Sequence, residues 1–204
     1  MMHRQSRDTA GEPVCGSVRK GFLQYNAASS DESWGHRMNN HDVSRFRWIP
    51  KDELLKRIRK CVKDFTTVFV NLELDQEQAP SDMAAPDSAV TAMIGFSGAY
   101  QGVVWVRCSE PLAERIAVGM WGNEPNGIDH NVQHALVEMV NILGEDIKLF
   151  LSPHGRGVTL SIASVFQGEE LCGPNLIDCP ESLLCSFLHQ GERLLVGMMV
   201  KKSL

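Results

Sequence analysis

The sequence lacks the features that mark several large classes of protein. Its six cysteines, at positions 15, 61, 108, 172, 179 and 185, contain no Cys-x-x-Cys pair, so neither a zinc knuckle nor a thioredoxin motif is present. No apolar run reaches the roughly 18 residues of a membrane-spanning helix, and the N-terminus has no hydrophobic signal-peptide region. We therefore expect free thiols, a reducing cytoplasm and no membrane contact.

Clustered positive charge is also absent. The first 50 residues carry 7 Lys and Arg and 5 Asp and Glu, whereas the rest of the chain carries 13 and 20, a formal charge of −7. An acidic body without a basic stripe is a poor match for the phosphates of nucleic acid. We expect protein partners and no nucleic acid.

Residues 1–50 differ in character from the rest. They are rich in Ser, Asn, Asp, Arg and Gly, and the five aromatic residues scattered among them follow no period. This composition predicts a disordered or loosely docked N-terminal tail, and the aromatics leave room for a docking segment. Met38 is a candidate second start site. The remaining residues, 51–204, are expected to form one globular domain.

Two long amphipathic helices organise the expected domain. Residues 51–69 place apolar side chains on one stripe and basic ones opposite, and residues 130–150 again repeat apolar residues at helical spacing, with Asp129 as a fair N-cap. A shorter helix between them is expected to begin after Ser109 and to end at Gly122.

Strands are expected around these helices. The pattern predicts them at 68–74, 89–96, 102–107, 158–165, 183–188 and 194–200, with a loop at 75–87 and two hairpins, 89–107 and 183–200. The fold class is therefore α+β, an antiparallel sheet with two long helices packed against it. Val90-Thr91-x-x-Ile94 recurs as Val158-Thr159-x-x-Ile162, which suggests two pseudo-symmetric helix-plus-strands halves.

The polar face of the second long helix carries the candidate site. Glu138 and Asn141 lie one turn apart on its expected solvent side, and four more polar residues lie near them: His130, His134, Glu145 and Lys148. Asn competes for backbone hydrogen bonds and forms helices poorly, so Asn141 is not there for local stability. The ordinary interpretation of such a pair is nevertheless a solvated surface.

A metal site is a rival interpretation of this face. His130, His134 and Glu138 stand at i, i+4 and i+8, and all three are metal-ligand types. Three ligands spread over two turns of a straight helix cannot readily converge on one ion, although two can, and the sequence marks no fourth ligand. We expect neither a metal nor a cofactor of the protein's own.

The run Glu138-x-x-Asn141-Ile142-Leu143-Gly144 is followed by Lys148. This run resembles the Glu-x-x-Asn helix of the CheX branch of the CheC-like chemotaxis phosphatases. Flanking pieces in the same order extend the resemblance over residues 88–170, and more thinly over 51–204: MIGFSG at 93–98, QGVV at 101–104, AERIAVGM at 113–120, VTLS at 158–161 and Gln167-Gly168. Some relatives carry Glu-x-x-Asn on both long helices. Here the first helix has Glu53-x-x-Lys56, so the chain resembles a one-site version.

The resemblance implies a CheC-like fold and a reaction: hydrolysis of the aspartyl phosphate of a phosphorylated CheY-type receiver domain in a response regulator. The receiver brings its own Mg²⁺, its own Lys and the acyl phosphate. Asn141 would position the attacking water, since an amide both accepts and donates hydrogen bonds. Glu138 would pair with the receiver's Lys and set the docking depth. The relatives pair through sheet edges, so a homodimer is expected.

Two residues depart from the pattern of the relatives. Glu145 and Asp146 stand where a second Gly and an Asn are expected. These acids would repel an acidic phosphorylated partner unless they face away or meet basic residues. The alternative function is a non-catalytic binding module that docks a receiver or a flagellar-switch-type partner.

Overall fold

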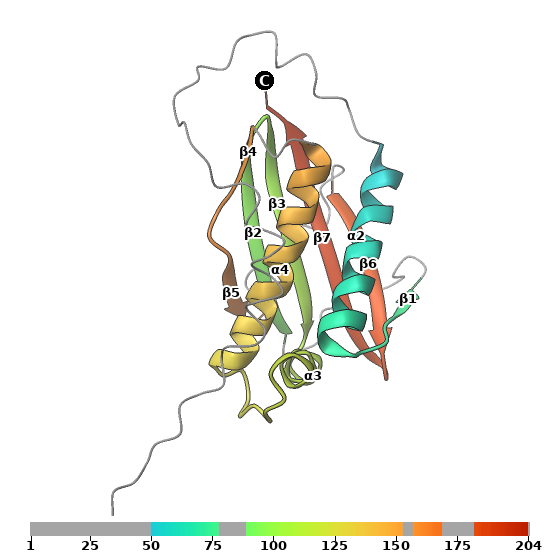
Figure 1. Cartoon of the computed structure of the whole chain (residues 1–204), viewed down its shortest axis with the longest axis vertical. Coiled ribbons are helices and arrows are strands. Elements are labelled where there is room, and N and C mark those ends of the chain that lie inside the picture. Colours follow the sequence, from blue (N-terminus) through green and yellow to red (C-terminus); the bar gives the residue numbers. More distant parts are fainter. Residues whose placement is uncertain (1–49, 78–88, 153–156, 169–181, 204) are drawn as a thin grey trace, which may run out of the picture. The chain divides into compact units, whose positions relative to one another are not determined.

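Two long helices lie against an antiparallel sheet in the computed structural model, which describes residues 50–77, 89–152, 157–168 and 182–203 (Figure 1). This arrangement confirms the predicted α+β class. The expectations for residues 1–49, including the tail and Met38, lie outside the described residues. None of the described helices combines the length and the apolar content that a membrane crossing requires.

The three helices begin and end close to the predicted residues. They are α2 (Lys51–Phe65), α3 (Glu110–Trp121) and α4 (His130–Leu151). The hydroxyl of Ser109 accepts a hydrogen bond from the Leu112 N–H, and Gly122 adopts the left-handed conformation at φ 73° that ends a helix. The cap signals in the sequence were therefore sufficient to locate α3.

Seven strands form one antiparallel sheet within the described residues. They are β1 (Asp75–Glu77), β2 (Ala89–Gly98), β3 (Tyr100–Ser109), β4 (Val158–Leu160), β5 (Ser164–Gln167), β6 (Ser182–His189) and β7 (Glu192–Lys202). Their order is β1-β6-β7-β3-β2-β4, with β5 also paired to β2. Both predicted hairpins are present. Gln190 and Gly191, at φ 51° and 86°, form the tight turn between β6 and β7.

The segment after α2 differs from the prediction. Instead of a strand at 68–74, residues Thr66–Val70 continue α2 as a π-helical turn that ends at Asn71, which has φ 52°. Val70 is buried in the core, so packing overrides the strand preference of this apolar run. The predicted loop at 75–87 begins with β1, an edge strand with no apolar pattern. Residues 78–88 lie outside the described residues.

The predicted strand at 158–165 is interrupted at residues 161–163. There, Ser161 and Gly95 of β2 form two hydrogen bonds in place of the regular strand pairing. The Gly95 N–H donates to the Ser161 hydroxyl at 2.9 Å, and the Ser161 N–H donates to the Gly95 carbonyl at 2.8 Å. A serine hydroxyl that bonds to nearby backbone competes with regular strand pairing. This interruption divides the segment into β4 and β5.

The sheet is built from two related halves. One half contains α2, β1, β2 and β3, and the other contains α4, β4 with β5, β6 and β7. The edge strand of each half pairs with the hairpin of the other, β1 with β6 and both β4 and β5 with β2, while β3 and β7 meet in the middle. This exchange supports the predicted pseudo-symmetry.

The sequence echo that suggested the two halves marks non-equivalent strands. Its two copies lie in β2 and at β4, which pair with each other, with Phe96 opposite Leu160. Ile94 is only 2% exposed whereas Ile162 is 92% exposed. The echo is therefore a coincidence, although the inference drawn from it was correct.

A single hydrophobic core fills the space between the sheet and the helices. It includes α2 residues such as Ile58 and Phe65, α4 residues such as Met139 and Leu143, and inward-facing strand residues such as Val196. Burial of one face of α4 fixes the direction of its opposite face, which carries the candidate site.

Candidate functional site

Asp129 fixes the start of α4. One of its carboxylate oxygens, Oδ1, accepts hydrogen bonds from the backbone N–H groups of Asn131 at 2.9 Å and Val132 at 3.1 Å. Backbone hydrogen bonds, of which the one from the Val132 N–H has the largest effect, hold the pKa of Asp129 below its ordinary value. The Trp121 indole also donates to the Asn131 carbonyl at 3.3 Å. The end of α4 that leads to the candidate pair is thus fixed by side-chain contacts.

Glu138 and Asn141 lie on one face of α4, as predicted. Three residues advance the helix by about 300°, so the two side chains leave it about 60° apart, one above the other. Both residues are half-buried rather than fully exposed. Among the described residues, neither side chain has a hydrogen-bond or ion-pair partner. A carboxylate and an amide are therefore presented together, with their polar atoms uncommitted.

The two histidines extend the same face toward the start of α4. His130 and His134 are exposed, and their ring centres lie 4.0 Å apart at an interplanar angle of 55°. No group of three or more metal-ligand side chains gathers anywhere in the described ranges, which include Glu138. The three residues of the rival metal interpretation therefore share a helix face without forming a metal-ligand cluster.

Asp146, the first of the two departures from the relatives' pattern, faces α2. The guanidinium of Arg57 donates from Nε to one carboxylate oxygen at 2.6 Å and from Nη2 to the other at 2.5 Å. This two-pronged pair neutralises the acid and directs it away from the Glu138–Asn141 face. Asp146 therefore faces away from the candidate site and meets a basic residue, so it would not repel an acidic partner.

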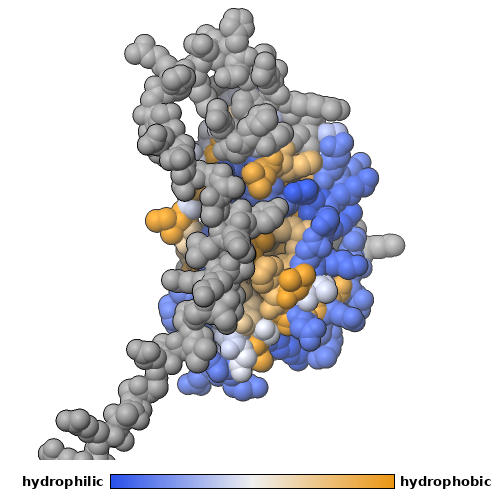
Figure 2. Space-filling view, viewed as in Figure 1, coloured by the Kyte–Doolittle hydropathy of each residue, from blue (hydrophilic) through white to orange (hydrophobic). Residues whose placement is uncertain are grey.

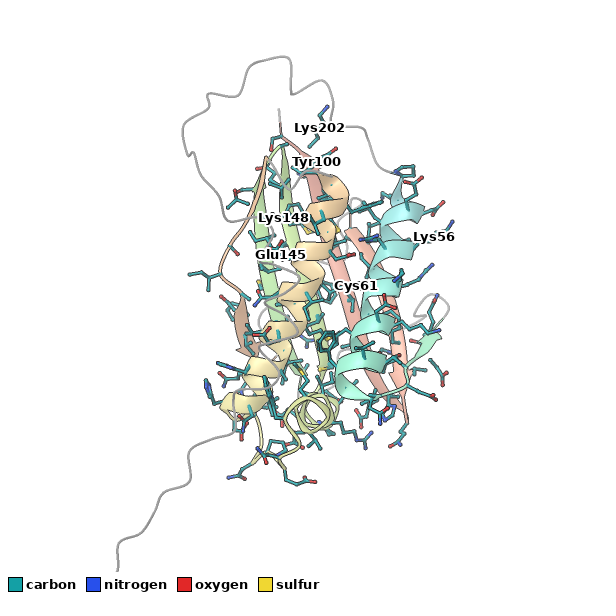
Figure 3. The ribbon with its side chains drawn as sticks, viewed as in Figure 1. Lys56, Cys61, Tyr100, Glu145, Lys148 and Lys202 are labelled. Atoms are coloured by element: carbon teal, nitrogen blue, oxygen red, sulfur yellow. The ribbon has the colours of Figure 1, made fainter. Side chains whose placement is uncertain are left out.

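Glu145, the second departure, stays on the polar face but has a cation beside it. The ammonium of Lys148, one turn further along, lies 3.2 Å from one of its oxygens and 3.3 Å from the other, and Figure 3 shows the two side chains on the same stretch of α4. The pair is partly exposed and its net charge is zero. Glu138 is therefore the one carboxylate on this face without a cation beside it among the described residues.

Gly144 brings this part of α4 close to the sheet. A Cβ at this position would lie 3.0 Å from the Ile94 Cγ2 and 3.4 Å from the Leu160 Cδ1, so the helix rests directly on β2 and β4. Interiors at this density resist displacement, which keeps Asn141, one turn earlier, on a rigid support. The residues after the Glu-x-x-Asn pair contain this support, but the sequence alone does not show what Gly144 approaches.

The cysteines in the described residues are buried and free. They are Cys61, Cys108 and Cys185. Burial, with the carboxylate of Asp146 nearby, raises the pKa of the Cys61 thiol to about 12. A protonated buried thiol is a poor nucleophile. The free state of these three thiols agrees with the prediction. The other three cysteines, at 15, 172 and 179, lie outside the described residues.

Comparisons with known proteins agree with this fold. Residues 90–179, which include Glu138 and Asn141, match the family model of the chemotaxis phosphatase CheX. Among solved structures, the chemotaxis protein CheX from Vibrio vulnificus is 20% identical, with a TM-score of 0.62 over 73% of this chain and 99% of that chain. No curated protein sequence matches the chain.

Two further solved structures show the same architecture. A CheC-like superfamily protein from Shewanella sp. PV-4 is 18% identical, with a TM-score of 0.59 over 73% of this chain and 97% of that one. CheX from Borrelia burgdorferi, solved as a CheX–CheY–BeF3–Mg²⁺ complex, is 16% identical, with a TM-score of 0.60 over 73% of this chain and 98% of that chain. The resemblance to CheX-type and CheC-like proteins is confirmed.

Proposed function

We propose that this CheX-like chain is a protein phosphatase that hydrolyses the aspartyl phosphate of a CheY-type receiver domain. The observation that carries the proposal is the Glu138–Asn141 pair, a carboxylate and an amide that leave one helix face together and have no partners among the described residues. The family match over residues 90–179 and the Borrelia burgdorferi complex of CheX with CheY support the substrate class.

In this proposal, Asn141 positions the attacking water. Its side-chain oxygen accepts a hydrogen bond from the water, and its NH₂ group donates to an oxygen of the phosphoryl group or of the receiver site. The water oxygen attacks phosphorus in line with the bond to the aspartyl oxygen. That bond breaks, its electrons return to the receiver's carboxylate, and a proton from the water passes to the released phosphate or to solvent. An amide suffices because phosphoryl transfer depends mainly on positioning and electrostatics.

Glu138 is the anchor in this proposal. It lies one turn before Asn141 and pairs with the lysine of the receiver site, so it fixes how deeply α4 docks. A pair that becomes partly desolvated at an interface contributes more than one in solvent, and losing one partner costs about 2 kcal/mol. Mg²⁺ belongs to the receiver, whose own carboxylates hold it. This chain supplies no metal ligand to the reaction.

The setting of the reaction follows from the same resemblance. The protein acts in a two-component or chemotaxis pathway in the cytoplasm, as a homodimer that pairs through sheet edges, without nucleic acid or membrane contact. Analytical ultracentrifugation tests the dimer directly. A monomer at micromolar concentration would remove the dimer from the proposal and leave the Glu138–Asn141 chemistry unaffected, because that pair lies on one helix.

The deciding experiment measures the decay of a phosphorylated receiver domain from the same organism, with Mg²⁺ and with or without this protein. We compare wild type with Asn141→Ala and with Gln133→Ala, which removes an amide from an exposed position of the same helix. Wild type and Gln133→Ala should accelerate the decay. Asn141→Ala should still bind the receiver, but its acceleration of the decay should be smaller by about a hundredfold or more.

The alternative proposal is a binding module without catalysis. It predicts that wild type binds activated receivers and leaves their decay rate unchanged. Because binding and decay are measured on the same receivers, unaltered decay together with binding would replace the phosphatase by the binding module. Acceleration that Asn141→Ala retains would leave a phosphatase but remove Asn141 from its mechanism.

A further inference from the structure

α2 is the structural counterpart of α4, and its residues can be matched to those of α4 by burial. In α4, the residues one, five and nine positions after Glu138 are buried: Met139, Leu143 and Ile147. In α2, the residues one, five and nine positions after Glu53 are buried as well: Leu54, Ile58 and Val62. The exchange of edge strands between the halves makes the two helices equivalent. Lys56 therefore occupies the position on α2 that Asn141 occupies on α4.

The outward face of α2 is basic. Lys56, Lys60 and Lys63 are all exposed and lie within about 60° of one another, opposite the buried stripe. Lys60 pairs with Asp64, whereas Lys56 and Lys63 have no partner among the described residues. Figure 2 shows hydrophilic surface over α2, and Figure 3 shows Lys56 extending outward from the helix. This face is a local excess of positive charge on an acidic chain.

The basic face of α2 and the polar face of α4 point the same way. Both helices lie on the same side of the sheet and run in opposite directions (Figure 1), and each face is opposite its own buried stripe. The Arg57–Asp146 pair fixes their relative level. Moving six residues along α2 from Arg57 to Lys63, and six back along α4 from Asp146, covers about 9 Å in each helix. The count along α4 ends at Val140, so Lys63 lies approximately level with Val140 and its neighbour Asn141.

We propose that the outward face of α2, formed by Lys56, Lys60 and Lys63, is a second docking surface for the same receiver domain and contacts an acidic part of it. This inference rests on the proposed function. Packed helices lie about 8–10 Å apart, and a domain of about 100 residues has a radius of gyration of about 13 Å, so a receiver seated on α4 also covers α2. In this proposal, the position on α2 that corresponds to Asn141 carries the ammonium group of Lys56, which attracts the receiver instead of positioning a water molecule.

Charge explains why such a docking surface is needed. The receiver site presents a phosphoryl group and carboxylates, and the face that approaches it carries the unpaired carboxylate of Glu138. The body of this chain adds a formal charge of −7. Long-range repulsion would slow encounter, whereas cations beside the site accelerate it and are screened by salt. α2 contains six basic and three acidic residues, so it supplies the opposite sign next to the site.

The test measures association rather than chemistry. The ligand is a receiver domain activated with beryllofluoride and Mg²⁺, and association rates are measured by stopped flow at low and high salt. Lys56→Glu/Lys63→Glu is compared with Arg115→Glu/Lys202→Glu, which makes the same change in net charge at exposed positions on α3 and at the end of β7. The α2 variant should associate about tenfold more slowly at low salt, the difference should shrink at high salt, and the control should change less than twofold.

The outcomes separate this inference from the proposed function. Receiver decay at saturating protein should be as fast for the α2 variant as for wild type, because Lys56 and Lys63 do not touch the phosphoryl group. Equal slowing in both variants, or none in either, would overturn the docking surface even if wild type is a phosphatase. If wild type binds without accelerating decay and only the α2 variant associates slowly, the phosphatase fails and the docking surface stands.

Discussion

Arg57 of α2 and Asp146 of α4 are joined by two hydrogen bonds, from Nε to Oδ2 and from Nη2 to Oδ1, of 2.6 and 2.5 Å. The guanidinium also lies 5.7 Å from the ring centre of Phe150. The pair connects the two halves of the fold across the helix layer. It also converts an acid that departs from the relatives' pattern into a structural contact.

Replacing Asp146 by Ala should lower the free energy of unfolding by about 1 kcal/mol, because a two-pronged, partly buried pair exceeds an ordinary surface pair. The matched control is Asp64→Ala, which removes the more exposed pair with Lys60 and should cost less than Asp146→Ala. Urea denaturation measures both values. Equal losses in the two variants would show that Arg57 and Asp146 contribute no more than a solvent-exposed pair.

Glu138→Gln should weaken binding to an activated receiver without destabilising the protein. Gln keeps the size of the side chain and removes its charge, so the proposed pair with the receiver's lysine is lost. A loss of about 2 kcal/mol raises the dissociation constant about thirtyfold. Stability should not change, because Glu138 has no partner among the described residues. Isothermal titration calorimetry and urea denaturation measure the two quantities, and unchanged affinity would contradict the anchor role.

Gly119→Ala should destabilise the protein although Ala favours helices. A Cβ at residue 119 would lie 2.3 Å from the backbone oxygen of Val70, which has no flexible end to move aside. We expect a loss of more than about 2 kcal/mol, against a gain of about 1 kcal/mol from helix propensity. Gly144→Ala is the control, because its Cβ would meet only side-chain methyl groups, at 3.0 Å or more. Thermal denaturation measures both variants. A lower melting temperature for Gly144→Ala than for Gly119→Ala would contradict the predicted clash with Val70.

Stability should fall in alkaline solution because of the buried thiols. Burial, with the nearby Glu192 carboxylate, raises the pKa of Cys108 to about 12, from an ordinary value of 9.0. Between these two values the unfolded thiol ionises while the folded thiol keeps its proton, so the free energy of unfolding decreases as pH rises. The slope is up to about 1.4 kcal/mol per pH unit for each such thiol. Urea denaturation at pH 8 to 10.5 should give a shallower slope for Cys108→Ala than for wild type.

Elements with strong local signals could be predicted from the sequence. Ser109, Gly122 and Asp129 are helix caps whose side chains or conformations act within a few residues, so they located α3 and the start of α4. Three of the four hairpin strands, β2, β3 and β7, contain Val, Ile or Thr residues at more than one position, and β6 is rich in Leu and Phe residues. The face shared by Glu138 and Asn141 also follows from helix geometry alone, since both lie on one regular helix.

Features that depend on distant contacts could not be predicted. The strand Asp75–Glu77 has no strand pattern and exists because β6 offers an edge, where Ser186 donates to Glu77 at 2.5 Å. Val70 packs into the core as part of a π-helical turn, which its β-branched sequence does not indicate. The neutralisation of Asp146 requires a partner 89 residues away. In each case the deciding contact is tertiary and leaves no local pattern.

The exchange of edge strands between the two halves has a consequence for synthesis on the ribosome. When β2 and β3 have emerged, β2 still lacks its neighbours β4 and β5, and β3 still lacks its neighbour β7. Residues 100–108 of β3 pair with residues 202–194 of β7. The edge of β2 stays unpaired until residues 158–167 are made, and the edge of β3 until β7 is made. Such edges invite pairing with other chains. The central pairing of the sheet, between β3 and β7, therefore forms only after residues 192–202 have left the ribosome.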